Sequence, residues 1–255
     1  PSSGVDGQTN QFASNGLEGT SNINLRGLGP ARTLVLINGH RQTYHPYSIG
    51  EQAQLFVDTN NIPTAAVGRI EVLKDGAAAL YGSDAIAGVV NFITNRDLDG
   101  FEVGGSYSQF DGTDGDYDIS AAYGLQGSNF SWVTSVGYNK RSEVALNEKD
   151  WAVLPNAENP VGGWSSLSNP GYYVPIGGAG TPIQGPTNDT GCEGVGGIIV
   201  AGTCRFQFTQ FDNLVEEEER FQVFSEYNRN LSNGAEVHLE ALYASSDVPT
   251  WKTSP

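Results

Sequence analysis

The sequence contains no methionine, only two cysteines and few charged residues. Charged side chains make up 16% of the 255 residues, whereas a soluble domain usually carries about a quarter. No apolar run approaches the roughly 18 residues that a transmembrane helix needs, which excludes a helical membrane span. Low charge combined with short apolar segments favours β structure, including the half-apolar strands of a membrane barrel.

Positive charge is the scarcer sign, with 13 Lys and Arg against 29 Asp and Glu. The resulting net charge of −16 argues against a nucleic-acid partner, because phosphates would be repelled. A sequence that starts at Pro1 without methionine is expected to be a piece of a mature exported protein whose leader is absent.

The two cysteines, Cys192 and Cys204, lie in a stretch rich in glycine and proline. They do not form a CxxC pair, so they have neither the spacing of a redox motif nor that of a zinc site. We predict a disulfide that staples a loop in an oxidising compartment. Two free thiols are the alternative.

The first part of the chain has the pattern of a small mixed α/β domain that ends near residue 97. We expect strands at 23–28, 33–39, 69–74 and 88–94. Asp75 is a good N-cap for a one-turn helix from Ala77 to Leu80, and Gly82 suits the position after its C-terminus.

From residue 101 the pattern changes to alternation of apolar and polar residues. Five segments show it: FEVGGSYS (101–108), YDISAAYGL (117–125), FSWVTSVGYN (130–139), FQVFSEYN (221–228) and AEVHLEALYA (235–244). Side chains alternate across a strand, so each segment has an apolar and a polar face. A length of about ten residues and aromatic residues near the strand ends favour a transmembrane barrel. A soluble β-sandwich would alternate too and remains the alternative.

The connections between these segments alternate in length. They are short at 126–128, very long at 144–218 and short again at 231–234. Outer-membrane barrels have short periplasmic turns and longer external loops. If the first strand rises from the periplasm, 111–116 and 144–218 are external, and the cysteines lie outside.

Two stretches resemble the plug domain of TonB-dependent outer-membrane transporters: NINLRGLGPARTLVLINGHRQ and VDTNNIPTAAVGRIEVLKDGAAALYGSDAIAGVVNFIT. They share the family's RG turn, its VLING strand, and its block from the IP pair through RIEV and YG to GVVN. The resemblance covers 22–96 densely. It implies a small mixed α/β plug domain (1–97) followed by antiparallel transmembrane β-barrel strands (98–255). These strands would be a fragment of a large barrel with about 22 strands and a filled lumen.

The resemblance also implies where cargo binds, namely at outward-facing plug loops and external barrel loops. The loop at 40–50 offers donors, rings and a cation suited to a chelate or sugar-like ligand. Its candidate residues are His40, Arg41, Gln42, Tyr44, His45 and Tyr47. A second loop offers Asn10, Gln11 and Phe12. The alternative for both is a solvated loop.

Charged residues on otherwise apolar plug strands are candidates for ion pairs with the barrel wall. They are Arg26, Arg69, Glu71 and Lys74. Buried charge is rare without a partner, which favours such pairs over solvated strand edges.

The sequence predicts neither a metal site, nor a cofactor, nor an enzyme. His40 and His45 lack a third ligand nearby. The stretch from Asp111 to Asp118 could hold calcium, but it lacks the EF-hand spacing, so a hairpin turn is favoured. The run EEEER (216–220) is expected to be a solvated loop end. No serine motif has the context of a catalytic nucleophile.

The resemblance implies an active transporter of the bacterial outer membrane, embedded in lipid. It would bind a small-molecule or oligosaccharide nutrient, such as a siderophore or cobalamin, and import it to the periplasm. Energy must come from an inner-membrane partner, TonB, because a ligand shifts an equilibrium only by its differential affinity. The alternative is a secreted soluble binding module such as an adhesin or lectin. Trp132 and Tyr243 decide between them, since a soluble module would pack both in a dry core.

Overall fold

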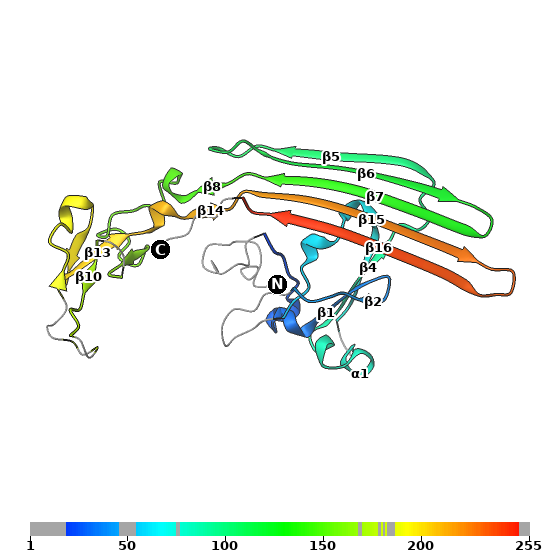
Figure 1. Ribbon diagram of the computed structural model, residues 1–255, viewed down its shortest axis with the longest axis horizontal. Coiled ribbons are helices and arrows are strands. Elements are labelled where there is room, and N and C mark those ends of the chain that lie inside the picture. The colour runs from blue at the N-terminus through cyan, green and yellow to red at the C-terminus, as the bar shows by residue number, and fades with distance from the viewer. Residues whose placement is uncertain are drawn as a thin grey trace. The chain divides into compact units, whose positions relative to one another are not determined.

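The computed structural model of the chain (Figure 1) describes residues 19–45, 55–74, 77–167, 170–177, 180, 182 and 187–249. The chain divides into two compact units. The first consists of residues 1–143 and 216–251, and the second of residues 144–215 and 252–255. No helix among the described residues is long and apolar enough to cross a membrane.

The N-terminal part of the first unit is built around a four-stranded mixed sheet, the plug sheet. Its strands are β1 (Thr33–Ile37), β2 (His40–Arg41), β3 (Val67–Leu73) and β4 (Gly88–Thr94), in the order β2-β1-β4-β3. Strands β1 and β4 are parallel, and the other pairs are antiparallel. Every residue of β1 is buried, as is typical of a parallel strand covered on both faces. Three of the four predicted plug strands are therefore confirmed.

Two local predictions in the plug are confirmed and one is wrong. Asn38 and Gly39 both have positive φ, at 49° and 83°, and join β1 to β2 as an Asn-Gly turn. Helix α1 (Ala77–Tyr81) is followed by Gly82 with φ 85°; the predicted cap, Asp75, lies outside the described residues. The predicted strand at 23–28 is a 3₁₀ turn, because Arg26 and Gly27 both have positive φ, which an extended strand does not allow.

Short 3₁₀ helices recur in the described part of the plug outside the sheet. They span Leu25–Gly27, Pro30–Arg32, Thr59–Asn61, Thr64–Ala66 and Ser83–Ala85. Two apolar clusters form the core on either side of the sheet: Leu34, Leu36, Ala85 and Val89 on one, and Val35, Ile37, Val57 and Ile62 on the other.

The second part of this unit is an antiparallel sheet of five long strands, here called the wall sheet. Its strands are β5 (Gly100–Ser108), β6 (Asp116–Gln126), β7 (Phe130–Arg141), β15 (Glu218–Asn230) and β16 (Glu236–Asp247). Their order is β16-β15-β7-β6-β5. We call the end with the tight connections at 127–129 and 231–235 the short-turn end, and the end with 109–115 and 142–217 the long-loop end.

The register of the wall sheet gathers the predicted apolar residues on one face. Tyr123 lies opposite Phe101 and Thr134, and Trp132 lies opposite Tyr227. This apolar face is open, since Trp132 is 37% exposed and Tyr243 is 61% exposed. The two diagnostic residues are therefore not packed in a dry two-layer core, and the predicted alternation is confirmed.

The plug lies against the opposite, polar face of the wall sheet, here called the plug face. Leu98, in the link between plug and wall, packs with Ala122 and Val133 of that face. Gly124 leaves room for this link, because a Cβ there would lie 2.0 Å from the Leu98 carbonyl oxygen. Figure 1 shows β1, β2 and β4 on this side of the five long strands.

The second unit consists of short strands and turns. Its strands are β8 (Val144–Ala145), β9 (Trp164–Ser165), β10 (Tyr172–Tyr173), β11 (Thr187–Asn188), β12 (Ile198–Val200), β13 (Thr203–Gln207) and β14 (Asn213–Val215). They pair as β10-β11, β12-β13-β9 and β14-β8. Its 3₁₀ helices span Leu146–Glu148, Glu193–Val195 and Thr209–Phe211.

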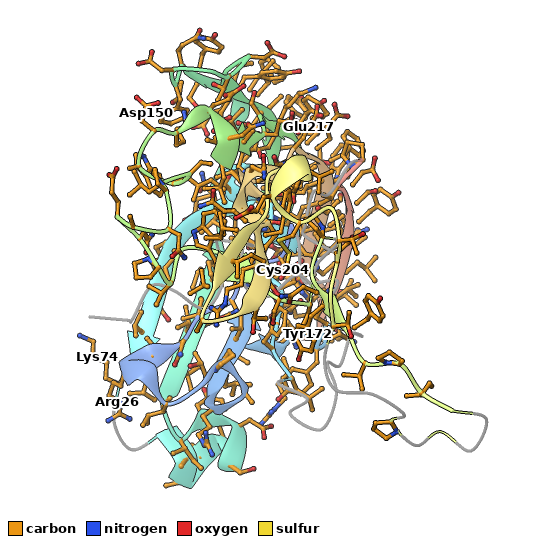
Figure 2. The ribbon with its side chains drawn as sticks, turned by 90° about the vertical axis from the view of Figure 1, so that its left-hand side faces the viewer. Arg26, Lys74, Asp150, Tyr172, Cys204 and Glu217 are labelled. Carbon is orange, nitrogen blue, oxygen red and sulfur yellow. A yellow bond between two sulfur atoms is a disulfide. The ribbon has the colours of Figure 1, made fainter. Side chains whose placement is uncertain are left out.

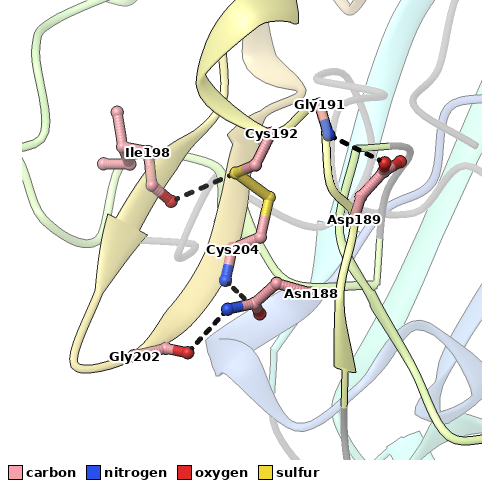
Figure 3. Close-up of a disulfide and its surroundings, with 7 residues drawn as sticks. All are labelled: Asn188, Asp189, Gly191, Cys192, Ile198, Gly202 and Cys204. Carbon is pink, nitrogen blue, oxygen red and sulfur yellow. Dashed lines mark hydrogen bonds between the residues drawn. A yellow bond between two sulfur atoms is a disulfide. The ribbon is translucent and has the colours of Figure 1, made fainter.

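A disulfide joins Cys192 to Cys204, as predicted (Figure 3). Asn188 secures the same corner, since its Oδ1 accepts a hydrogen bond from the Cys204 amide at 2.9 Å. Its Nδ2 donates to the Gly202 carbonyl at 2.8 Å. The disulfide therefore ties the β12–β13 hairpin to the turn before it.

Candidate functional site

One buried carboxylate of the wall holds the plug at three points. Glu226 on β15 is 1% exposed and accepts hydrogen bonds from Asn38 Nδ2 at 3.2 Å and from the Thr94 hydroxyl. Arg96 Nε lies 2.6 Å from its Oε1, and Asn228 Nδ2 donates to the same oxygen at 2.9 Å. A buried charge is tolerated only when it is paired and hydrogen-bonded, and here the plug supplies most of these partners.

A second wall carboxylate, Glu240 on β16, extends this contact. Asn38 Nδ2 also donates to Glu240 Oε2 at 3.1 Å, so one plug amide bridges two wall carboxylates. His238 lies between them and stacks on His40 of the plug, with ring centroids 5.8 Å apart. We call the whole group the Glu226 cluster: Asn38, His40, Thr94, Arg96, Glu226, Asn228, His238 and Glu240. It lies toward the short-turn end of the wall sheet.

The long-loop end of β15 holds a second buried carboxylate. Glu218 is fully buried and pairs with the Arg220 guanidinium and with Arg141 Nη2 at 3.1 Å. Ser246 donates to it at 2.9 Å. The expectation of a solvated loop end at 216–220 is therefore wrong, because β15 already begins at Glu218 and turns that side chain onto the plug face.

Asp58 organises the plug at the same end. Its Oδ1 accepts from the backbone amides of Ser21 and Asn60, each at 3.0 Å, and so joins two plug segments. Burial raises the pKa of Asp58 above its usual value, and the two backbone hydrogen bonds partly oppose that rise. Gln222 of the wall donates to the Asn60 carbonyl, which brings this corner of the plug onto β15.

The predicted cargo residues of the loop at 40–50 have partners within the unit. His40 belongs to the Glu226 cluster, and Arg41 Nη1 pairs with Asp84 at 2.7 Å. Gln42 Nε2 donates to the His40 carbonyl at 3.1 Å. Cargo binding by these residues stays a prediction, and His40 lies at the short-turn end of the wall.

Tyr44 and His45, the next two candidates, lie in different surroundings. Tyr44 is exposed, and the pKa of its phenol is raised by desolvation and by the nearby Asp84 carboxylate. His45 stacks on Phe56 at 5.3 Å between ring centroids. Asn10, Gln11, Phe12 and Tyr47 lie outside the described residues, so their role stays a prediction.

Three of the four charged residues predicted to pair with the wall have contacts within the plug. Arg69 pairs with Glu71 on its own strand, Nε to Oε1 at 2.9 Å, and both are exposed. Arg26 Nη2 donates to the carbonyls of Ile86 and Ala87 at 3.0 and 3.1 Å. Lys74 is exposed, and Figure 2 shows its side chain pointing away from the plug. Pairing of these four residues with the wall stays a prediction.

Arg96, which does pair with the wall, was not predicted. Its place in the sequence could have indicated this role, because Arg96 is the cation between the last plug strand, which ends at Thr94, and the first wall strand, which begins at Gly100. Among the described residues, no group of three or more His, Cys, Asp and Glu side chains could hold a metal. The acidic stretch after β5 forms a hairpin turn. Asp116, the first residue of β6, accepts a hydrogen bond through Oδ1 from the Ser142 amide at 2.8 Å.

Residues 3–89 match the family model of the TonB-dependent receptor plug domain. This part of the chain is therefore similar to the plug domains of TonB-dependent receptors. The chain is 44% identical over 84 residues to the iron-regulated outer membrane virulence protein of Vibrio cholerae, which covers 31% of the chain and 12% of that relative. It is 32% identical over 177 residues to the vitamin B12 transporter BtuB of Photobacterium profundum, which covers 64% and 27%.

A third relative is the ferric enterobactin receptor PirA of Pseudomonas aeruginosa, 42% identical over 80 residues, which cover 30% of this chain and 11% of that one. The chain thus spans from about a tenth to about a quarter of the length of these relatives. In structure it resembles a mutant of the ferric enterobactin receptor PfeA of Pseudomonas aeruginosa, in complex with enterobactin, with a TM-score of 0.55. That likeness has 19% identity over 89% of this chain and 27% of the other, so it shows the fold alone.

These similarities place the chain in the bacterial outer membrane, as its sequence predicts. Two of these relatives are named as a transporter and a receptor. The plug sheet lies on the polar face of long antiparallel strands, and the solved receptor shares this fold.

Proposed function

We propose that the protein is an active transporter that binds an extracellular nutrient and imports it into the periplasm. The observation that carries this is the plug–wall interface. The plug contacts the wall through hydrogen bonds and ion pairs around Glu226 and Gln222, among other contacts, and water can replace these polar partners when the plug moves.

The wall sheet continues into a closed barrel. Strands β5 and β16 are edges of the five-stranded sheet, and in lipid only a closed barrel satisfies the backbone groups of edge strands. We therefore assign residues 1–97 to the plug and 98–255 to the first strands of a barrel with about 22 strands. In this arrangement 144–218 is a long external loop.

Cargo binds from outside, and its release requires an external source of energy. A ligand alone moves the plug only as far as its differential affinity for the two plug positions allows. The partner that supplies the energy is TonB of the inner membrane, acting on the plug from the periplasm. The family that residues 3–89 match is named for its dependence on TonB, which supports TonB as the partner.

The cargo we favour is a metal chelate. One relative is named for iron regulation, a second for ferric enterobactin and a third for vitamin B12. The second unit supplies exposed rings at Trp151, Tyr173 and Phe211, and rings with a few polar groups suit a large chelate. An oligosaccharide is the remaining cargo class that these rings would bind.

Uptake by cells that carry the full-length receptor tests the proposal. Cells are given a ferric catecholate, cobalamin or a linear oligosaccharide, each radiolabelled, with and without a protonophore. We expect one compound to bind in both conditions and to enter only when the proton gradient is intact.

Two results would contradict the proposal. Entry at the same rate without the gradient indicates a passive pore. A receptor that stays monodisperse without detergent indicates a soluble binding module. The matched control is the same receptor with the plug removed, which should lose the dependence on the gradient.

A further inference from the structure

The Glu226 cluster places one imidazole ring between two carboxylates. His238 Nε2 lies 3.5 Å from Glu240 Oε2, and Nδ1 lies 3.7 Å from Glu226 Oε1. Nδ1 is also 2.6 Å from Asn228 Oδ1. The Asn228 amide is oriented by its own donation to Glu226, so its oxygen faces the ring. The neutral ring therefore carries its proton on Nδ1.

This tautomer leaves an unfavourable contact on the other side of the ring. In neutral His238 the lone pair of Nε2 points at a carboxylate that is itself only an acceptor. Within the described part of the chain, Nε2 is buried and has no hydrogen-bond partner. A second proton on the ring turns Nε2 into a donor, and Glu240 then accepts from it.

The balance of charges in the Glu226 cluster also favours the protonated ring. Glu226 and Glu240 are balanced by one permanent cation, Arg96. A neutral His238 leaves one negative charge without compensation in a poorly solvated site, whereas a protonated His238 balances it. Both the hydrogen bonds and the charges are therefore best satisfied when the ring is protonated.

We infer that Glu226, Glu240 and His238 form a proton-sensitive clamp of the wall on the plug, closed when His238 is protonated. The clamp holds the turn at Asn38 and the end of β4 at Thr94. Loss of the proton leaves an Nε2 lone pair facing Glu240 Oε2, and the two repel each other. Because Asn38 of the plug donates to the same oxygen, the contact with the plug weakens as the pH rises. Imidazole is the side chain that ordinarily titrates in the physiological range.

His238 itself contacts His40 of the plug, Glu226 and Asn228 of β15, and Glu240 of β16. Asn38, Thr94 and Arg96 of the plug reach the same cluster through Glu226. His40 is the second titratable ring, and its protonation would oppose the stack with His238. The variant His40→Phe keeps an aromatic ring there without a proton and separates the two effects.

The significance of the clamp for transport rests on the proposed function, but the clamp itself does not. If the short-turn end faces the periplasm, the plug is held more tightly when that compartment is acidic. The wall would then release the turn of β1 and the end of β4 more easily at neutral and basic pH.

Hydrogen exchange of the full-length receptor in lipid nanodiscs tests the clamp. Exchange of peptides covering 33–41 and 88–96 is measured from pH 6 to pH 8 and divided by the intrinsic rate at each pH. We expect opening of these segments to rise several-fold over this range. His238→Gln, whose amide can donate to Glu240 at every pH, should remove the rise and keep opening low. His40→Phe should retain the rise.

Two controls make the outcome decisive. Peptides covering 55–62, at the other end of the plug, should have the same profile in the parent and in His238→Gln. Glu236→Gln, at an exposed position on β16, should leave the profile of the parent unchanged. The clamp is refuted if the parent shows equal opening at pH 6 and pH 8, or if His238→Gln keeps the rise. A rise in a receptor that imports none of the tested compounds refutes the transport proposal and leaves the clamp intact.

Discussion

The apolar face of the wall sheet gives the sharpest test of the membrane assignment. Val136 lies in the middle of β7, opposite Ala121 and Val223, and is 39% exposed. Lysine at this position would place its ammonium at the centre of the hydrocarbon. The cost measured for such substitutions at the bilayer midplane is about 2–4 kcal/mol, falling to about 0–1 near the interfaces.

The matched control is Val237, which lies on the same face at the short-turn end of β16 and is similarly exposed, at 36%. Val136→Lys should therefore lower the free energy of unfolding by about 3 kcal/mol, and Val237→Lys by less than about 1 kcal/mol. Since each 1.4 kcal/mol is a factor of about ten, the two variants differ roughly 30-fold or more in their unfolding equilibrium.

Urea unfolding of the full-length receptor in lipid vesicles measures both values, with tryptophan fluorescence as the signal. Exposed substitutions in a soluble protein usually change stability by less than about 0.5 kcal/mol. Equal and small effects of Val136→Lys and Val237→Lys would mean that this face meets water, and the membrane assignment would be wrong.

The further predictions concern the plug, its link to the wall and the second unit. Glu226→Ala should destabilise the plug by about 3 kcal/mol in urea unfolding, because it removes a buried carboxylate that pairs with Arg96 and accepts from two plug side chains, and Glu226→Gln should cost less. Gly124→Val should raise hydrogen exchange of the link at 95–100, since even a Cβ would collide with the Leu98 carbonyl. Asp58→Ala should cost about 1–2 kcal/mol by loss of the cap, seen as faster exchange at 58–62. Because burial raises the pKa of Asp58, its ionisation disfavours the folded plug; the parent should lose stability relative to Asp58→Asn as pH rises through that pKa, and equal profiles would contradict this. Cys204→Ser should increase proteolysis within 187–207 by loss of a cross-link worth about 3 kcal/mol, without changing proteolysis of the wall sheet.

Most strands could be predicted from local pattern. Val89, Val90 and their neighbours form a β-branched run that only a buried strand accommodates, and the Asn-Gly pair at Asn38 fixes the turn after β1. The wall strands follow from alternation over about ten residues, because a side chain must face either the plug or the surroundings. The disulfide follows from two cysteines confined to one loop.

The partners across the interface could not be predicted in this way. Glu226 meets Arg96 from 130 positions away and Asn38 from 188 positions away, and no local pattern records such pairs. The pair that Arg69 and Glu71 form on one face of β3 is local, whereas their predicted pairing with the wall stays a prediction. Glu218 looked like part of an exposed acidic run, but strand alternation turns it inward while Glu217 and Glu219 pair with Lys140.

The composition of the plug–wall interface is compatible with the proposed displacement of the plug. Apolar contact across it includes Leu98 with Ala122 and Val133, at the link where the chain is continuous and separation is not required. Hydrogen bonds also join the plug to the wall, at Glu226 near one end of the strands and at Gln222 toward the other. A hydrogen bond exchanged for one to water changes stability by only about 1 kcal/mol, whereas separating a dry apolar core costs about 25 cal/mol for each Å² exposed. Under the proposed function, water in the lumen would therefore take over the polar partners of the plug one at a time, while the apolar link would keep the plug attached to the wall.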